Sequence, residues 1–406
     1  MDSRIHKDYN LSALRRHYTD PQRLYNELRA HDSIYFDATS RCWLVTGYAA
    51  MVAILHDPRF TSQPGNSPAS HTSMNSLQRS IGKQFLFLDG EAHKRAQEVV
   101  LKPLAQMVKG MPDDIRAFVR STVESLQGKE EIDVVKDFAS PVSLLVIAHI
   151  LGIPLDDYEQ LVQLEQWSDT FGDITSGYFR GDMQNIVRME NYFRQLVAAK
   201  RKAPADDLLS AFIEAQHVFP DEDDLVANCM MVFGAGRITS KKLLGNGIPI
   251  LLEQWPQLQE DFHRQPGFAK LLAEELFRWV TPTRCLIRQA REDIDLSPQF
   301  PGNHYIRCGE KVLLFLEAAN YDPACFVQPE QFQPQRRPNK HIAFGQGPHQ
   351  CPGAALARVE VQIALETLFS LVRFRSKPGT RPVWNSNANL GGYTSYTLLQ
   401  EALIRS

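Results

Sequence analysis

The spacing of apolar residues along the chain predicts a mostly helical protein. Residues 21–29 and 48–56 place apolar side chains at the intervals of short amphipathic helices. Helical periodicity resumes at residue 91 and continues, with interruptions, to about residue 276. Within that region, residues 223–254 are expected to form one long helix, and residues 354–371 form another helix-prone run.

Shorter β-rich runs lie toward the two ends of the chain. Residues 33–36 and 42–46 read as a hairpin with a polar turn between them, and residues 282–315 alternate β-rich segments with turns. Residues 61–80 and the proline-rich residues 323–339 are expected to be irregular. The pattern alone therefore predicts a mixed, mainly α fold.

Composition adds bounds on the class of protein. The chain has 406 residues, of which 43% are hydrophobic and 22% are charged, as in ordinary globular proteins. Its net charge of −3 gives no reason to expect binding to nucleic acid or to an anionic membrane. Since no linker, repeat or change in composition marks a boundary, residues 1–406 are expected to form a single domain.

The N-terminal region and the cysteines indicate a cytoplasmic protein without a membrane anchor. The first thirty residues are polar and contain no apolar span long enough to cross a membrane. The six cysteines are scattered singly, with no Cys-x-x-Cys pair and no dense disulfide framework. This usage fits a reducing compartment.

The segment that carries most chemical information is FGQGPHQCPG, residues 344–353. Cys351 lies just before a helix-prone run, and Gly347 and Gly353 let backbone N–H groups approach its sulfur. A single thiolate suits haem iron better than zinc or an iron–sulfur cluster, which need several ligands. The alternative interpretation is a buried structural cysteine in a turn.

The spacing Phe-x-x-Gly-x-His-x-Cys-x-Gly resembles the haem-binding loop of the cytochrome P450 superfamily. The resemblance implies the cytochrome P450 fold, mainly α with small β-sheets, and a haem b cofactor with Cys351 as its axial thiolate and metal ligand. It also implies that Phe344, His349 and Gly353 belong to the cofactor-binding loop.

Further segments match the family in its order along the chain. Glu275 and Arg278 are three residues apart and can pair on one helix face. In the family this pair binds an arginine before the cysteine loop, for which Arg336 and Arg337 are the candidates.

Three other residues resemble the family's ligands for the haem propionates. Arg288 follows the helix of the Glu-x-x-Arg pair, and a guanidinium suits a carboxylate. His93, four residues after Asp89, matches the family histidine, and His341 is a further candidate. One turn after His93 the family usually has arginine, whereas this chain has Gln97.

The middle of the predicted long helix resembles the family's oxygen-activating segment, Ala-Gly-x-(Asp/Glu)-Thr. Ala235, Gly236 and Thr239 fit this pattern and are the predicted catalytic residues. Ile238 occupies the position of the acid, which in the family helps to deliver protons. Since isoleucine cannot carry a proton, protons are expected to come from water or a substrate group.

This stretch is most similar to the mycocyclosin synthase-like members of the superfamily, which oxidise cyclodipeptides. They share Phe-Gly-Ala-Gly with isoleucine before the alcohol residue. The later segment after Trp384 contains Asn385, Asn387 and Asn389, whose amides suit the edges of a peptide-like molecule. The expected substrate is therefore a cyclodipeptide or a similar small amide. Trp167, Phe171 and Tyr178 are predicted to line the pocket with that segment.

The resemblance implies a haem-thiolate oxidase or monooxygenase of specialised metabolism that uses O2. No flavin or ferredoxin segment follows the haem-binding loop, so electrons are expected from a separate ferredoxin and ferredoxin reductase. These would dock on a basic surface that includes Lys102 and Arg358. Two alternatives stay open: a conventional hydroxylase of a small hydrophobic molecule such as a fatty acid, terpenoid or polyketide, and a non-catalytic helper of a glycosyltransferase.

Overall fold

A computed structural model describes residues 10–63, 83–177, 181–255, 258, 262 and 267–403. Its α-helices, in chain order, are α2 (Leu11–Arg16), α3 (Gln22–His31), α4 (Tyr48–His56), α6 (Gly90–Gly110), α7 (Pro112–Glu124), α8 (Ser140–Leu151), α9 (Tyr158–Thr175), α10 (Gln184–Lys202), α11 (Leu208–Glu214), α12 (Glu222–Gln254), α14 (Phe268–Val280), α15 (Leu316–Ala319) and α16 (Ala354–Leu371). Three short non-α helical turns are η2 (Phe85–Phe87), η3 (Val134–Ala139) and η4 (Gly347–His349).

The strands of the described residues form four small sheets. Their bounds are β1 (Ile34–Asp37), β2 (Cys42–Val45), β3 (Phe60–Thr61), β4 (Glu131–Asp133), β5 (Cys285–Ala290), β6 (Ile294–Asp295), β7 (Tyr305–Ile306), β8 (Lys311–Phe315), β9 (Val372–Ser376), β10 (Val383–Asn385), β11 (Gly392–Ser395) and β12 (Thr397–Leu403). The largest sheet has the order β1-β2-β8-β5-β3, in which only β2 and β8 pair in parallel. The others are β4-β12-β9, β10-β11 and β6-β7.

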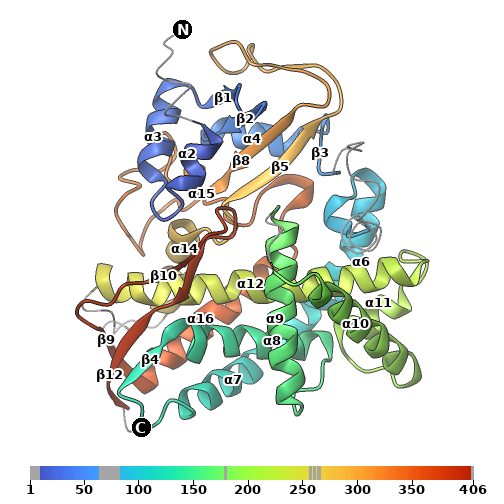
Figure 1. The fold of residues 1–406 in the computed structure, drawn as a ribbon, viewed down its shortest axis with the longest axis vertical. Helices are drawn as coiled ribbons and strands as arrows, with labels where there is room; N and C mark the ends of the chain where they lie inside the picture. Colours follow the sequence, from blue (N-terminus) through green and yellow to red (C-terminus); the bar gives the residue numbers. More distant parts are fainter. Residues whose placement is uncertain are drawn as a thin grey trace.

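The large sheet and the helices form two adjoining parts with separate hydrophobic clusters. The sheet lies with α2, α3 and α4 at one end of the molecule, and α7, α8, α12 and α16 form the helical body at the other (Figure 1). The largest cluster fills the helical body, and two smaller clusters cover the faces of the sheet. Mainly helical structure with small sheets is the architecture that the sequence predicted.

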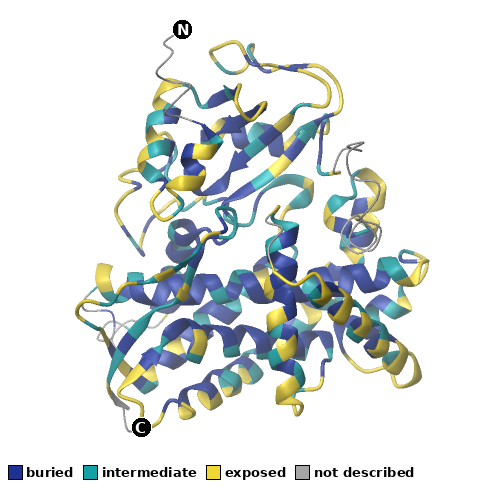
Figure 2. Cartoon of the chain, viewed as in Figure 1, coloured by how far each residue is buried: buried dark blue, intermediate teal, exposed yellow. Residues whose placement is uncertain are grey.

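The long central helix α12 organises the molecule. Asp221 accepts a hydrogen bond from the backbone N–H of Asp223, and acidic residues in the first turn oppose the positive end of the helix dipole. The helix packs against α8, α9, α10 and α16 and is buried along most of its length (Figure 2). This burial makes its few accessible residues informative about function.

Most predicted elements are confirmed. Helix α4 and helix α16 have the predicted bounds, and α12 begins one residue earlier than expected. The hairpin is present as β1 and β2, in which Ile34 pairs with Val45. Most of the predicted loop at residues 61–80 lies outside the described residues, as does Tyr178.

One stretch in the described part of the chain, Val134–Leu151, is long and apolar enough to cross a membrane by length and composition alone. Of this stretch, 72% is buried inside the protein. Burial of this extent is also what the core helix of a globular protein shows.

Candidate haem site

The loop that carries Cys351 is held in a tight conformation. Gly345 and Gly347 adopt left-handed backbone angles, with φ values of 66° and 74°. A Cβ at position 347 would lie 2.5 Å from the carbonyl oxygen of Leu55, so only glycine fits there. The backbone N–H of Cys351 donates to the carbonyl of Phe344 at 2.9 Å. These constraints fix the direction of the sulfur.

Cys351 has a large accessible surface although many protein atoms surround its thiol. Burial raises the pKa of its thiol, while the backbone N–H of Gly353 and the charge of Arg358 oppose that shift. An accessible sulfur with buried surroundings faces an internal space. The N–H of Gly353 and the nearby guanidinium favour the thiolate form that an iron ligand requires.

A second accessible residue lies on α12. Ala235 is exposed, whereas Phe233, Gly234 and Arg237 beside it are buried. Thr239, one turn later, is partly exposed and donates its hydroxyl proton to the carbonyl of Ala235 at 2.7 Å. Helix α12 therefore turns a small-residue face toward an internal space, as the resemblance implies for the oxygen-activating segment.

The other small residues of this segment allow close helix packing. A Cβ at Gly236 would be 2.5 Å from Ile147 Cδ1, although the residue itself remains partly exposed. The side chain of Ile238 packs against α9 at Gly172. A Cβ added to Gly172 would lie only 2.4 Å from Ile238 Cδ1. The side chain at the acid position therefore fills a hydrophobic contact between α12 and α9.

His93, Arg288 and His349 come together from α6, β5 and the cysteine loop. The rings of His93 and His349 lie with centroids 3.9 Å apart. Burial lowers the pKa of His349 to about 4. His93 and Arg288 lower this pKa further, whereas Asp89 raises it. Burial also lowers the pKa of His93. The charge of Arg288 reinforces this shift, and the charge of Asp89 opposes it.

The nearby carboxylate does not balance these groups. Asp89 accepts hydrogen bonds from Thr61 and from Arg291 at 2.6 Å, besides lying 3.1 Å from His349 Nε2. Nδ1 of His349 is buried and has no hydrogen-bond partner among the described residues.

This arrangement fits a haem. Its propionates would supply the anions that the cluster of His93, Arg288 and His349 lacks, and a partner for the unbonded His349 nitrogen. Cys351 offers one thiolate to the iron, and the exposed Ala235 leaves a small-residue helix face for a flat ring. The part of the chain that the structure describes contains no group of three or more His, Cys, Asp or Glu side chains suited to a metal ion. A single-thiolate haem site therefore matches the donor set better than a multi-ligand metal site.

His341 lies in different surroundings from the other predicted propionate ligands. Its Nε2 is 3.1 Å from Glu274, and its Nδ1 accepts from the backbone N–H of Ala343 at 3.4 Å. Arg358 donates to the same carboxylate at 2.6 Å. Burial alone would raise the pKa of Glu274, but hydrogen bonds from His341 and Arg358 lower it to about 2. The structure therefore gives His341 a protein carboxylate as its partner, which the sequence interpretation missed.

Gln97, where the family usually has arginine, contacts the cysteine loop itself. Its Nε2 donates to the carbonyls of Pro348 at 3.1 Å and Gln350 at 3.4 Å. The contact joins α6 to the cysteine loop. Gln97 is therefore not part of the cluster of His93, Arg288 and His349.

The Glu-x-x-Arg pair forms the centre of a buried network. Glu275 and Arg278 are both fully buried and paired at 2.7 Å. Of the two predicted arginines, Arg336 is the partner, with its Nε 3.1 Å from Glu275. Arg278 also donates to the carbonyls of Asn320 and Pro329. The network holds the irregular segment before the cysteine loop against α14.

The asparagine-rich segment after Trp384 binds mainly to itself and to its neighbours. The Asn385 oxygen accepts from the Asn387 backbone N–H, and the Asn389 oxygen accepts from the Cys285 N–H. The amide of Asn387 donates to Asp173 at 2.8 Å. These side chains are engaged within the protein, which was not expected of pocket-facing amides. Of the predicted pocket aromatics, Trp167 and Phe171 are buried, and Phe171 packs against Gly234.

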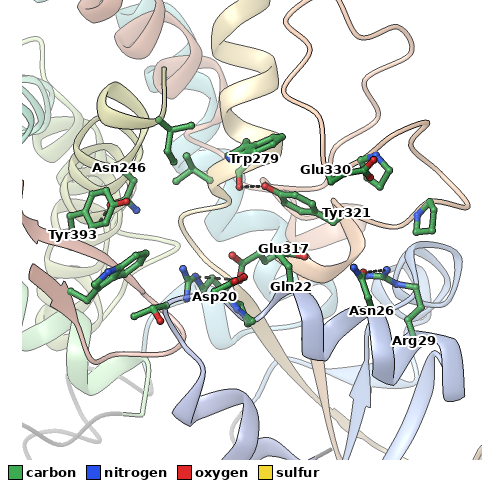
Figure 3. A pocket seen from close by; sticks show the side chains of 18 of the residues that line it. Asp20, Gln22, Asn26, Arg29, Asn246, Trp279, Glu317, Tyr321, Glu330 and Tyr393 are labelled. Atoms are coloured by element: carbon green, nitrogen blue, oxygen red, sulfur yellow. Dashed lines mark hydrogen bonds and ion pairs between the residues drawn. The ribbon is translucent and has the colours of Figure 1, made fainter. Parts of the chain in front are cut away.

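A separate cavity of about 710 Å³ lies beside the far half of α12. Asn246 and Ile250 of α12 line it together with Arg284 and Glu317 (Figure 3). Trp279 and Tyr321 form part of its wall, and the Tyr321 hydroxyl donates to the carbonyl of Trp279 at 3.1 Å. The cysteine loop does not line this cavity.

Comparison with known proteins identifies the family of the chain. Residues 268–395 match the family model of cytochrome P450. The chain is 32% identical to the biotin biosynthesis cytochrome P450 of Bacillus subtilis, over 86% of this chain and 88% of that protein. It is 29% identical to the polyketide biosynthesis cytochrome P450 PksS of the same organism, over 82% of each.

A solved structure shows the same fold. The crystal structure of P450BioI in complex with acyl carrier protein ligated to hexadec-9Z-enoic acid superposes with a TM-score of 0.86 and 29% identity, covering 96% of this chain and all of that one. Sequence identity and coverage of this extent, together with the match of the family model, show membership of the family and not only a similar fold. The chain belongs to the cytochrome P450 family of haem-thiolate monooxygenases.

Proposed function

We propose that this cytochrome P450 oxidises a small, largely apolar molecule of specialised metabolism, with Cys351 as the thiolate ligand of its haem and residues 1–406 as one catalytic domain. The observation that carries the assignment of the site is the pairing of an accessible sulfur with the anion-deficient cluster of His93, Arg288 and His349. The intact cysteine loop argues against a non-catalytic helper of a glycosyltransferase.

The residues around the sulfur take distinct roles in this proposal. His93, Arg288 and His349 bind the propionates as charge-assisted hydrogen-bond donors. Phe344 holds the Cys351 backbone through its carbonyl and packs its ring under the Arg358 guanidinium at 4.6 Å. Gly353 directs its N–H to the sulfur. His341 fixes the loop to α14 through Glu274.

On the opposite face, Ala235 and Gly236 leave room for O2 and substrate, and the Thr239 hydroxyl orients water there. A haem bound in this cradle supplies the reductive activation of O2, in which one oxygen atom enters the substrate and the other is reduced to water. The protein supplies position, exclusion of bulk water and protons.

An apolar substrate is favoured over an amide because Asn387 is engaged through both its oxygen and its nitrogen, and the side-chain oxygens of Asn385 and Asn389 already accept hydrogen bonds. Relatives support the same class. P450BioI was crystallised with a fatty acyl chain on its carrier protein, and the myxobacterial CYP267B1, 26% identical with a TM-score of 0.83, was crystallised with myristic acid. A fatty acyl or similar chain is therefore our first candidate.

A cyclodipeptide is the second candidate. The segment from Phe233 to Thr239, with isoleucine at the acid position, is the observation that favours it. An amide substrate would then find its hydrogen-bond partners among side chains other than the three asparagines.

A separate ferredoxin, reduced by a ferredoxin reductase, is the proposed electron donor. Gln97 fastens α6, which carries Lys102, to the cysteine loop, and the charge of Arg358 acts on Cys351. Lys102 has a side chain that is 79% exposed, and Arg358 is partly exposed on α16. These charges suit an acidic partner. Six cysteines without a disulfide agree with a cytoplasmic setting.

A spectral titration of the ferric protein tests the substrate class. Fatty acids, an acyl carrier protein loaded with a fatty acyl chain, terpenoids and cyclodipeptides are added in turn, and the Soret shift caused by displacement of iron-bound water is followed. We expect saturable shifts with acyl chains and none with cyclodipeptides. A shift with cyclodipeptides alone would reverse the order of the two candidates.

A further inference from the structure

Helix α12 carries an unusual lysine one turn beyond the acid position. Lys242 follows Ile238 by four residues and Thr239 by three, so it shares a helix face with both. Ile238 is packed over Gly172 and holds no proton. Lys241 also lies three residues after Ile238, but its ammonium is paired with Glu165 and Asp169. Lys242 is therefore the titratable side chain of α12 nearest to the acid position that is not held in an ion pair among the described residues.

The Lys242 side chain is buried without a partner. The residue is only 7% exposed, and no hydrogen bond or ion pair involves its ammonium in the described part of the chain. The two carboxylates that face it from α9 are already engaged. Asp169 is paired with Arg237 and with Lys241 at 3.1 Å, and Asp173 accepts from Asn387.

The charges around Lys242 leave it able to exchange a proton near neutral pH. Burial lowers its pKa to about 7, with Asp169 and Asp173 opposing the shift and Arg284 and Lys241 adding to it. Glu360 of α16 does not compensate, since it hydrogen-bonds to Ser240, which lies about half a helical turn away from Lys242. Burial makes the charged form of such a lysine energetically costly, so the side chain can gain and release a proton.

The same helix face continues to the cavity of about 710 Å³ described above. Asn246 lies one turn beyond Lys242 and lines that cavity, as does Arg284, which acts on Lys242 through its charge (Figure 3). The cavity includes the polar side chains of Asp20, Glu317 and Glu330, which can hold water. Thr239, Lys242 and Asn246 therefore lie along one face of α12, between its small-residue segment and a polar cavity.

We propose that Lys242 replaces the missing acid as the proton-relay residue of this enzyme, acting through water that the Thr239 hydroxyl orients and drawing its protons from the cavity beside Asn246. In each transfer the Lys242 ammonium releases one proton toward Thr239 and becomes a neutral amine. It then regains a proton from water in the cavity. No other bond forms or breaks, and the electrons come from the ferredoxin. The inference rests on the proposed placement of Thr239 at the oxygen site.

One test reads the lysine directly, without catalysis. Holoenzyme labelled with [ε-¹³C]lysine is studied by NMR as its diamagnetic ferrous carbonyl complex. We expect one Cε resonance to titrate near pH 7, as the Lys242 environment implies, and to vanish in both Lys242→Arg and Lys242→Met. If every lysine resonance titrates near the ordinary value of 10.5, the relay is wrong.

A second test follows the fate of oxygen during turnover with NADPH, a plant-type ferredoxin and its reductase. Even without substrate, O2 is reduced to two waters with four electrons and four protons when proton delivery is fast, and it leaves as hydrogen peroxide after two electrons and two protons when delivery is slow. In the wild type we expect the peroxide fraction to rise at least about threefold between roughly pH 6 and pH 8.5, as the ammonium is lost. Lys242→Met should show the high fraction at every pH.

Matched variants separate proton transfer from charge and packing. Lys242→Arg keeps the charge but does not release a proton, so it should behave like Lys242→Met. Lys241→Met removes a charge that lowers the pKa of Lys242 and frees Asp169, so it should keep the pH dependence but move it to higher pH. Ile238→Glu combined with Lys242→Met restores an acid and should lower the peroxide fraction again. A wild-type profile in Lys242→Met, with the thiolate-type carbonyl spectrum intact, would overturn the relay and leave the proposed function standing. Loss of that spectrum in the wild type would instead overturn the proposed function.

Discussion

The rings of His93 and His349 stack with their centroids 3.9 Å apart, although they belong to α6 and to the cysteine loop. Both imidazoles are disfavoured in their protonated form. Burial, reinforced by the positive charge of Arg288, lowers the pKa of His93 and of His349. Such an arrangement is stabilised when an anion joins it. The relationship therefore indicates where the propionates of the haem bind.

Substitution of these residues should weaken haem retention without removing thiolate ligation. Each of His93→Ala, His349→Ala and Arg288→Ala removes a hydrogen bond to a charged group, worth about 1.5–3 kcal/mol. We expect haem transfer to apomyoglobin to become roughly ten- to a hundredfold faster in each variant. His341→Ala is the comparison, because its partner is Glu274. Faster haem transfer in His341→Ala than in His349→Ala would contradict the assignment.

The Glu275 network should be the most sensitive ionic site for stability. Glu275 is fully buried and satisfies Arg278, Arg336 and Asn339. Removing its charge leaves guanidinium groups buried without a partner, which destabilises a protein by about 3–5 kcal/mol. Urea unfolding of Glu275→Gln should show a loss of this size. Glu98→Gln, at an exposed pair with Lys102, should show no measurable loss. Equal effects of the two changes would refute the structural role of the network.

Thr239 should matter less than the alcohol residue of relatives that keep the acid. With Ile238 at the acid position, the hydroxyl only orients water, which can partly take its place. Thr239→Ala is expected to keep turnover within about tenfold of the wild type, equivalent to roughly 1.4 kcal/mol of barrier. It should also keep the pH dependence that Lys242 imposes. A loss of three orders of magnitude, with haem and substrate binding intact, would show that the hydroxyl carries the relay alone.

Lys242 should leave a signature in stability as well as in chemistry. Its folded-state pKa of about 7 lies below the ordinary value of 10.5, so the unfolded chain binds the proton more tightly. The resulting destabilisation, on the order of 5 kcal/mol, is full below pH 7 and fades as the pH rises toward 10.5. Lys242→Met should therefore melt at a higher temperature than the wild type near neutral pH, and the gap should narrow as the pH is raised. A gap that is independent of pH would exclude an unpaired lysine at this position.

The sequence predicted the elements whose signal is local. Helices α4, α12 and α16 have long periodic patterns, and the cysteine loop has a distinctive spacing of glycines around Cys351. The resemblance to cytochromes P450 added residues that no local pattern connects. His93, Arg288 and His349 are far apart in the chain, and the structure brings the three together.

Other features depend on contacts that a single sequence does not reveal. Strand β4 has three residues and exists because Asp133 pairs with Thr397, far along the chain. The partner of His341 is Glu274, which lies next to the expected Glu275 and has no motif of its own. The asparagines after Trp384 were predicted to face a ligand, but Asn387 instead binds Asp173. Short polar side chains often bond to nearby backbone, and sequence alone cannot show which partner they find.

The most direct test of the account is the carbon monoxide difference spectrum of the ferrous protein. Cys351 is the proposed thiolate ligand, so the wild type should show the red-shifted Soret band of thiolate-bound haem and Cys351→Ala should lose it. Cys308→Ala, which removes another exposed cysteine, is the control and should keep the band. A thiolate-type band that persists in Cys351→Ala, or is absent from haem-loaded wild-type protein, would contradict the central claim.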